Sequence, residues 1–432
     1  MMRFPAGLRA LRHRDFRLFW TGQLVSLVGT WMQSVGQSWL VLELTGSPLK
    51  LGLIGTLQFT PMLLFSLFAG AITDRLPKRR LILRTQTALM VLAFVLSALV
   101  WSGRVQYWHV AVLATLLGVV NTVDMPARQA FIVDMVGKED LMNAIALNSA
   151  MFNGARIVGP AVAGLLVARY GVAPAFFLNG LSFLAVIAAL RAIRAEGLPG
   201  PRRSESILEE IGAGLRYALR TPLVGLVLSL LLVVSVFVIN YNVTVPVFAR
   251  DVLGQEAEGF GLLMAALGSG ALAGALTLAA LGRSRPPLAA VVAPALLLSA
   301  AAAGMAAVRQ FGLAAAVLFV MGYSQILFTA SCNTTLQVTA PDELRGRVMS
   351  LYALVFAGVT PIGALFAGSI TEAFGVATGF LAGGGLSLVS ILALLAWWRA
   401  RAPRGRPTPR PEGGRGAGTP LPPGAGDGDR AP

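Results

Sequence analysis

Long apolar segments constrain this chain more than any other feature of its sequence. A helix needs about 20 apolar residues to cross roughly 30 Å of hydrocarbon, and such segments recur with short polar breaks between them. The composition is 56% hydrophobic and only 13% charged, too little polar surface for a soluble globule of 432 residues. We predict an all-α membrane protein with twelve spans, at about residues 16–42, 50–73, 80–101, 106–127, 141–168, 172–193, 223–248, 258–281, 287–307, 312–335, 346–370 and 375–398.

The positive charge is distributed unevenly over the loops between these spans. If the spans alternate in direction, most of the 35 lysines and arginines fall on one side of the membrane. Loops rich in Lys and Arg stay in the cytoplasm, so both termini are predicted to be cytoplasmic. The net charge of +15 therefore indicates topology rather than a nucleic-acid partner. The surrounding partner that we expect is the lipid bilayer.

The two halves of the chain repeat each other at an offset of about 204 residues. Glu139-Asp140-Leu141 matches Asp342-Glu343-Leu344, and Gly171-Val172-Ala173 matches Gly375-Val376-Ala377. An even number of spans in each half gives two halves of parallel orientation. We predict two pseudo-symmetric six-helix bundles, at residues 1–193 and 223–398.

Two further segments are not predicted to span the membrane. Residues 194–222 form a cytoplasmic linker in which Ser206 and Glu209 fit a capping box. Four apolar residues follow at helical spacing and predict a short amphipathic helix there: Leu208, Ile211, Leu215 and Leu219. Residues 399–432 are rich in proline, glycine and arginine, which predicts a disordered cytoplasmic tail.

The candidate motifs for enzymatic chemistry or cofactor binding lack the residues or the structural context that such motifs require. Lys138 is followed by Glu139, where a phosphate-binding loop needs Ser or Thr. The stretch from Gly268 to Ala273 mimics a dinucleotide fingerprint, but it lies inside a predicted span with no strand before it. A single cysteine, Cys332, excludes an internal disulfide and any cysteine-based metal cluster. We expect neither an enzyme nor a protein with a bound cofactor or metal.

A short charged loop follows the second span and carries a family resemblance. The sequence from Gly70 to Arg80 reads GAITDRLPKRR. It resembles the loop between helices 2 and 3 of the major facilitator superfamily, Gly-x-x-x-Asp-Arg-x-Gly-Arg-Arg/Lys, with Pro77 in place of the second glycine. The resemblance implies the major facilitator fold, in which two six-helix bundles surround a central cavity.

The resemblance is nearest to a bacterial branch of this superfamily that contains the enterobactin exporter and macrolide efflux proteins. It covers roughly residues 11–397 and includes Phe16-Arg17-Leu-Phe-Trp20, Thr45-Gly46-Ser47-Pro48, Pro126-Ala-Arg128-Gln129, Ala155-Arg156-Ile157-x-Gly159-Pro160 and Glu343-Leu344-Arg345-Gly346-Arg347-Val348. It implies a multi-pass protein of the bacterial inner (plasma) membrane. We expect it to be monomeric.

The fifth predicted span contains Arg156, about 15 residues from its start. A charge near mid-membrane is costly and usually faces a wet cavity or a partner. Arg156 is therefore predicted to contact substrate or to balance a coupling proton, and a structural link to neighbouring polar groups is the alternative. Ala155, Gly159 and Ala163 form a small-residue stripe on the same span. With Pro160, this stripe resembles the helix-5 motif of antiporters in the superfamily.

Asp124 is the one carboxylate that falls clearly inside a predicted span. It could carry a coupling proton if burial raised its pKa. Arg128 follows four residues later, a spacing that also favours a simple ion pair on one helix face. Both interpretations remain open from the sequence. The proton-coupling candidates are Asp124 and Arg156.

Polar side chains on several spans suggest an amphipathic pocket for a small organic substrate. Each one could equally serve interhelical hydrogen bonding. The predicted substrate-binding residues are Gln33, Gln37, Gln58, Asn121, Arg156, Asn240, Tyr241 and Gln325.

The family resemblance also implies a conformational switch at the cytoplasmic side. In the superfamily the acid at the position of Asp74 sits against the start of helix 11 and nearby cations; here these would be the helix beginning near Gly346 and Arg128. The predicted switch residues are Gly70, Asp74, Arg75, Arg79, Arg128, Gly159, Pro160, Arg345 and Gly346.

These features predict a secondary active transporter that works by alternating access. The resemblance implies export, driven by the proton gradient, of a drug, a siderophore or a similar metabolite. Uptake or lipid movement by the same fold is the alternative. A non-transporting scaffold or sensor is disfavoured, because the sequence offers no soluble domain of useful size.

Overall fold

The computed structural model describes residues 6–197, 207–281 and 286–401, apart from the side chains of 6, 66–74, 207–211, 213 and 401. This part of the chain is helical almost throughout. Its first half comprises η1 (Ala6–Arg12), α1 (Arg14–Thr45), α2 (Pro48–Arg75), α3 (Lys78–Trp101), α4 (Tyr107–Val136), α5 (Leu141–Tyr170) and α6 (Ala173–Ala192).

The second half begins with α7 (Ile207–Arg220), which lies within the predicted linker. There follow α8 (Pro222–Phe237), α9 (Tyr241–Asp251), α10 (Ala257–Leu281), α11 (Leu288–Gly304), η2 (Met305–Ala307), α12 (Phe311–Thr339), α13 (Asp342–Ala353), the π-helical η3 (Leu354–Gly358), α14 (Thr360–Phe374) and α15 (Val376–Arg401). The capping residue Ser206 and the tail 402–432 lie outside the described residues, so these two predictions stay predictions.

Eleven stretches of the described residues are long and apolar enough to cross a membrane. Two of them join shorter helices: Pro222–Asp251 contains α8 and α9, and Asp342–Phe374 contains α13, η3 and α14. The 32-residue α1 is not among the eleven, because polar side chains such as Gln23, Gln33 and Gln37 interrupt its apolar character. With α1 added, the described residues form twelve membrane segments, and the predicted fold class is confirmed.

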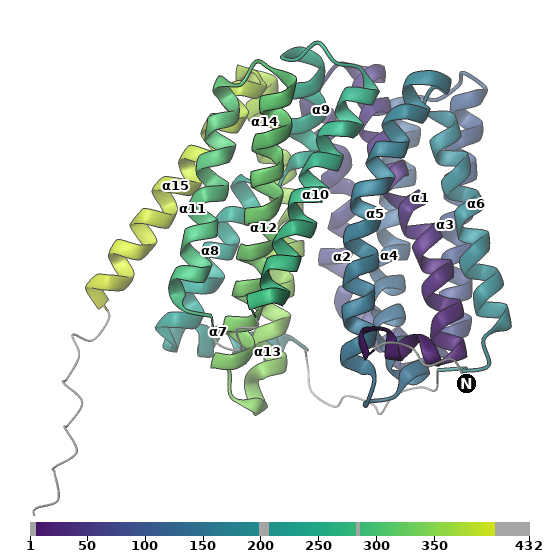
Figure 1. The fold of residues 1–432 in the computed structure, drawn as a ribbon, viewed down its shortest axis with the longest axis horizontal. Helices are drawn as coiled ribbons and strands as arrows, with labels where there is room; N and C mark the ends of the chain where they lie inside the picture. Colours follow the sequence, from purple (N-terminus) through teal and green to yellow (C-terminus); the bar gives the residue numbers. More distant parts are fainter. Residues whose placement is uncertain (1–5, 198–206, 282–285, 402–432) are drawn as a thin grey trace, which may run out of the picture.

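The helices form two bundles that stand side by side, α1–α6 in one and α8–α15 in the other (Figure 1). Within the first bundle, α6 packs on α1 and α3, and α2 packs on α4. Within the second, α12 packs on α10 and α11, and α15 packs on α8 and α11. The N-terminal segment and the lower end of α15 lie on the same face of the molecule (Figure 1).

Two helix pairs join the bundles, α5 with α10 and α2 with α14. Glycines permit these close approaches, because a side chain would have no room. A Cβ atom at Gly261 of α10 would lie 2.5 Å from the carbonyl oxygen of Pro160 in α5. A Cβ atom at Gly52 of α2 would collide with the carbonyl oxygen of Ala364 in α14. Small residues therefore set the distance between the bundles.

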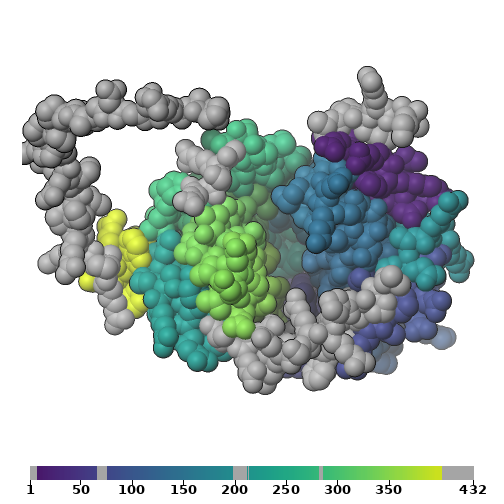
Figure 2. All heavy atoms as spheres, turned by 90° about the horizontal axis from the view of Figure 1, so that it is seen from below, coloured from purple at the N-terminus to yellow at the C-terminus, as the bar shows by residue number. Residues whose placement is uncertain are grey.

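The two ends of the bundle interface differ. At the end opposite the N-terminal segment, Ser47 Oγ and Leu49 N donate to Glu372 Oε2, at 2.8 and 3.2 Å. At the same end Arg250 Nη1 donates to the Leu42 carbonyl oxygen at 3.3 Å. The face that carries the N-terminal segment is hollowed between the two bundles (Figure 2). We call this opening the central hollow.

The structure corrects two predicted spans. The span expected at 223–248 is two helices, because α8 ends at Phe237 and α9 begins at Tyr241. Val238 and Ile239 in the break are apolar, so hydropathy alone gives no sign of it. The span expected at 346–370 begins earlier, at Asp342, and changes to π-helix over Leu354–Gly358.

Candidate functional site

Arg156 lies halfway along α5, where α5 meets the second bundle. Its side chain is 9% exposed, and its Nη2 donates a hydrogen bond to Gln325 Oε1 of α12 at 3.1 Å. Its guanidinium also lies over the ring of Trp31 in α1, 5.8 Å from the centroid. A Cβ atom at Gly268 of α10 would lie 2.7 Å from the Arg156 carbonyl oxygen. Arg156 therefore bridges the two bundles by side chain and backbone together.

The break between α8 and α9 places Tyr241 within electrostatic range of this arginine. Tyr241 is 6% exposed and interacts electrostatically with Arg156. Its hydroxyl has no hydrogen-bond partner among the described residues. Asn240 precedes it, and the Asn240 Nδ2 donates to the Val236 carbonyl oxygen at 2.8 Å. Asn240 thus caps the end of α8, while Tyr241 is left with an unused donor.

Other predicted substrate-binding residues are engaged inside the first bundle. Asn179 Nδ2 of α6 donates to Gln33 Oε1 at 2.5 Å. Gln37 Nε2 of α1 donates to Gln58 Oε1 of α2 at 3.3 Å. Asn121 is partly buried on α4. Of the predicted set, the structure therefore brings together Arg156 with Gln325 and Gln37 with Gln58, and it ties Gln33 to a partner that the sequence did not indicate.

Asp124 forms the ion pair that its spacing from Arg128 allows. Arg128 Nε lies 2.8 Å from Asp124 Oδ2, and the carboxylate is fully buried. Thr85 Oγ1 donates to it at 2.5 Å, and Gln86 Nε2 donates to both oxygens at 3.0 and 3.1 Å. Arg128 Nη1 also donates to Gln23 Oε1 at 2.7 Å. The Asp124 carboxylate therefore has a partner at each oxygen between α3 and α4, with Arg128 beside it rather than Arg156.

The predicted switch residues are only partly described. Gly70 lies within α2, and the side chain of Asp74 lies outside the described residues, so the expected contact of Asp74 with Gly346 or Arg128 stays a prediction. Arg75 is exposed. Arg79 Nε donates to the Leu190 carbonyl oxygen at 2.7 Å, which ties the start of α3 to the end of α6.

The remaining switch residues fall at three different places. Gly159 allows α1 to approach α5, because a Cβ atom there would lie 2.5 Å from Trp31 Cβ. Pro160 contributes the carbonyl oxygen that faces Gly261 at the bundle interface. Arg345 pairs with Asp342 at 2.5 Å, and Gly346 is exposed in the first turns of α13.

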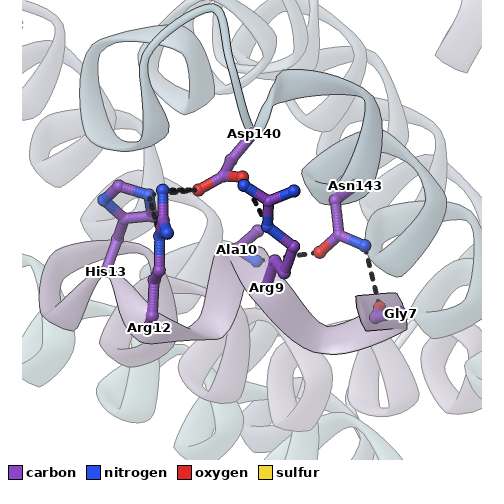
Figure 3. Close-up of polar contacts among 7 residues, drawn as sticks. All are labelled: Gly7, Arg9, Ala10, Arg12, His13, Asp140 and Asn143. Carbon is purple, nitrogen blue, oxygen red and sulfur yellow. Dashed lines mark hydrogen bonds and ion pairs between the residues drawn. The ribbon is translucent and has the colours of Figure 1, made fainter. Parts of the chain in front are cut away.

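A polar cluster that sequence reasoning missed holds the N-terminal segment against the start of α5 (Figure 3). Asp140 is 2% exposed, and its carboxylate contacts three basic side chains of the N-terminal segment. Arg12 Nη2 lies 2.8 Å from Asp140 Oδ2, Arg9 Nε lies 3.6 Å from Oδ1, and His13 Nε2 forms a 2.7 Å hydrogen bond with Oδ2. The hydrogen bond with His13 and the charges of Arg12 and Arg9 lower the pKa of Asp140, against the burial that raises it.

Asn143 completes this attachment one helical turn further on. Its Nδ2 donates to the Gly7 carbonyl oxygen at 2.9 Å, and its Oδ1 accepts from the Ala10 amide at 2.8 Å (Figure 3). The sequence contains both halves of this contact: a run of basic residues before α1 and an aspartate directly before α5. The sequence could not show that the two meet, because 127 residues separate His13 from Asp140.

Two bundles of membrane helices, joined by a buried arginine and open on one face, define a transporter of the major facilitator fold. The chain belongs to the family described as transmembrane secretion effectors, whose family model matches residues 6–406. It is a multi-pass membrane protein and a secondary active transporter, as the sequence predicted.

Curated relatives cover most of the chain. It is 30% identical over 380 residues to the multidrug efflux pump Tap of Mycolicibacterium fortuitum, covering 85% of this chain and 91% of that protein. It is 28% identical to the enterobactin exporter EntS of Shigella boydii, over 92% of this chain and 94% of that protein. It is 25% identical to the staphyloferrin A transporter of Staphylococcus aureus, over 84% and 91% respectively.

Solved structures share the fold at low sequence identity. The nucleoside transporter NupG superposes with a TM-score of 0.70 at 12% identity, covering 89% of this chain and 99% of that one. A bacterial homologue of the lysosomal transporter Spinster, solved in an inward-facing and unoccupied conformation, superposes with a TM-score of 0.66 at 13% identity, over 90% and 95% of the chains.

Proposed function

We propose that this transporter exports an amphipathic organic compound, of the drug or siderophore class, in exchange for protons. The observation that carries this proposal is the buried bridge from Arg156 to Gln325, which joins the two bundles at mid-membrane. A polar contact between two rigid bodies is where a substrate can compete with the protein's own groups. The names of the curated relatives, which are efflux pumps and siderophore transporters, support the choice of substrate class and direction.

The proposed cycle is a rocking of the two bundles about this bridge. The central hollow admits the substrate, the bundles then close over it, and the interface around Glu372 opens on the other side. No bound cofactor is needed, because the proton gradient supplies the free energy. A proton that moves down about 100 mV releases roughly 2.3 kcal/mol, and each pH unit adds about 1.4 kcal/mol. Together these sustain a concentration gradient of about a few hundredfold.

We place the protein in the inner (plasma) membrane, as a monomer with both termini in the cytoplasm. Two observations support this orientation: the excess of Lys and Arg in the loops of one side, and the position of the N-terminal segment and the end of α15 on one face (Figure 1). In this orientation the central hollow opens to the cytoplasm. Reporter fusions at the two termini test the orientation, and a reporter active only outside the cytoplasm at either end would overturn it.

The test of function compares cells that lack the gene with cells that express it, across a panel of fluorescent drugs and siderophores. For any compound that accumulates only in the deletion strain, proton movement is then followed in everted vesicles. Exchange predicts that adding the compound releases protons from acidified vesicles, whereas co-transport predicts the opposite flux. Arg156→Ala is expected to abolish transport while the protein stays in the membrane, and full transport by this variant would sink the proposal.

A further inference from the structure

The charge of Arg156 has no acidic counterpart in the described part of the chain. Its contacts there are neutral, the amide oxygen of Gln325 and the aromatic face of Trp31. Arg128, on α4 of the first bundle, has Asp124 at 2.8 Å. A guanidinium in a low-dielectric interior is costly unless an anion compensates it. The contrast between the two arginines indicates that Arg156 lacks a counterion among the described residues and is open to one supplied by a ligand.

The hydroxyl of Tyr241 points to the same conclusion independently. It is buried, it interacts electrostatically with Arg156, and it has no hydrogen-bond partner among the described residues. Buried polar groups usually have a partner, and although this hydroxyl is one of ten buried atoms without a hydrogen-bond partner in the described residues, it is the one that interacts electrostatically with Arg156. A phenol donates its proton, and an anionic oxygen is the acceptor that strengthens such a bond most.

The broken seventh membrane segment adds a positive pole at this point. The end of α8 is closed by donors of its own chain: Val238 N and Ile239 N donate to the Val234 carbonyl oxygen, and Asn240 Nδ2 donates to that of Val236. The 11-residue α9 begins at Tyr241 itself. The first amides of a helix have no acceptor within it and carry a partial positive charge. Broken membrane helices use such ends to bind anionic groups.

We propose that the transported compound carries a carboxylate, and that this group binds between Arg156 and Tyr241. The inference rests on the proposed function, because it names the substrate class of the same site. The planar guanidinium can hold both oxygens of a carboxylate, and Tyr241 donates to one of them. The carboxylate takes the place of Gln325 as acceptor, so a cationic or neutral compound of the same shape is rejected.

Three matched probes test this on the purified full-length protein in detergent: naphthalene-2-carboxylate, naphthalene-2-carboxamide and 2-naphthylmethylammonium. Binding is read from the rise in melting temperature with probe concentration. We expect the carboxylate alone to stabilise the wild type. Arg156→Gln should weaken its binding about 30-fold, since truncating one partner of a buried charge pair costs at least about that much. Tyr241→Phe should weaken it about tenfold.

Two further variants separate the site from the rest of the fold. Arg169→Gln makes the same chemical change at the exposed end of α5 and should bind the carboxylate as the wild type does. Gln325→Glu keeps the shape of the side chain that contacts Arg156 but supplies an internal carboxylate. It should lose carboxylate binding as fully as Arg156→Gln does, without lowering the melting temperature of the unliganded protein.

The inference is overturned if the carboxylate gives no stabilisation at about 10 mM, if the amide or the ammonium compound stabilises the protein equally, or if Gln325→Glu binds the carboxylate as tightly as the wild type. Its failure is distinct from failure of the proposed function. Proton-coupled export of neutral or cationic compounds alone would leave the proposed function standing and refute the carboxylate. Carboxylate binding without proton exchange would refute the proposed function and leave the carboxylate site standing.

Discussion

At the scale of single residues, Asp124 and Arg156 show two ways to keep a charge inside a membrane helix bundle. Asp124 receives a guanidinium and hydrogen bonds from two neighbouring side chains, so its negative charge is matched in place. Arg156 receives neutral groups and lies where the bundles meet. A matched charge holds helices together, whereas an unmatched one at a moving interface is available to a ligand.

Replacing Asp124 tests whether this carboxylate is structural. Asp124→Asn leaves the partly buried charge of Arg128 without its counterion, and such a loss costs about 3 kcal/mol of stability. We expect a lower melting temperature and an unchanged ratio of protons to substrate in the remaining transport. The double variant Asp124→Asn with Arg128→Gln should recover part of the stability. Substrate movement without proton movement in the single variant would instead identify Asp124 as the proton carrier.

The attachment of the N-terminal segment should be insensitive to pH over the neutral range. The pKa of Asp140 is lowered in the folded protein, mainly by its hydrogen bond with His13. The carboxylate therefore stabilises the docked segment at every pH above the ordinary aspartate value of about 3.9, and this contribution is lost only as the pH falls through the lowered value. Hydrogen exchange of residues 7–12, corrected for the intrinsic rate, should stay flat from neutral pH to about pH 4.

Asp140→Asn removes the negative charge shared by Arg9, Arg12 and His13, so exchange in residues 7–12 should be faster than in the wild type at every pH above about 4. Asp342→Asn is the matched control, because Asp342 pairs with Arg345 on the exposed start of α13 and does not contact the N-terminal segment. Loosening of the wild-type segment already near pH 6 would contradict the assignment of Asp140 as its anchor.

Single residues show where prediction from the sequence stops. The pairing of Asp124 with Arg128 followed from their spacing on one helix. The contacts of Arg156 with Gln325 and of Gln33 with Asn179 did not, because the partners are 169 and 146 residues apart. A pattern along one helix tells which residues share a face, but the partner on another helix depends on how the helices pack.

At the scale of elements, small residues determine how closely the helices approach. Gly261 of α10 meets Pro160 and Gly164 of α5, with no space for a methyl group. The same arrangement occurs where Gly52 of α2 meets Ala364 of α14. The stripe of small residues on α5 was visible in the sequence. The sequence did not show that α10 packs on this stripe, because a pattern of small residues does not identify the partner helix.

A methyl group at Gly261 should therefore force α5 and α10 apart. Gly261→Ala is expected to destabilise the described conformation by about 1–3 kcal/mol, the usual cost of overpacking, and to slow transport. Gly154→Ala on α5 is the control, because a Cβ atom there meets nothing within 4 Å. Melting temperature and transport rate in proteoliposomes provide the measurements. Equal behaviour of the two variants would show that the α5–α10 contact is not close packed.

Apolar length predicted the membrane segments well, since the hydrocarbon thickness sets it. It missed the interruption at Val238–Asn240 because Val238 and Ile239 are as apolar as their neighbours and a single asparagine does not break an apolar span. The freed carbonyl groups are satisfied by Asn240 and by nearby backbone amides, which are local tertiary details. Hydropathy therefore could not resolve the break between α8 and α9, which positions Tyr241 in the proposed site.

At the scale of the whole molecule, the internal repeat predicts two like halves but not the tilt between them. The same two bundles can close at either end, and sequence symmetry favours neither. In the described conformation the contacts of Ser47 and Arg250, together with the stacking of Trp39 on Phe260, close the end opposite the N-terminal segment. The other end is hollowed (Figure 2). Alternating access requires that these closing contacts break in every cycle.

Holding that end closed should therefore stop transport without harming the fold. Ser47→Cys with Glu372→Cys places two thiols where Ser47 Oγ now donates to Glu372 at 2.8 Å, in a Cys332→Ala background that removes the single native cysteine. A short bifunctional thiol reagent should abolish transport in the double variant and leave each single variant active. A cleavable reagent should restore transport on reduction. Full transport by the cross-linked protein would mean that the two bundles do not separate at this end, because a covalent bridge there cannot coexist with its opening.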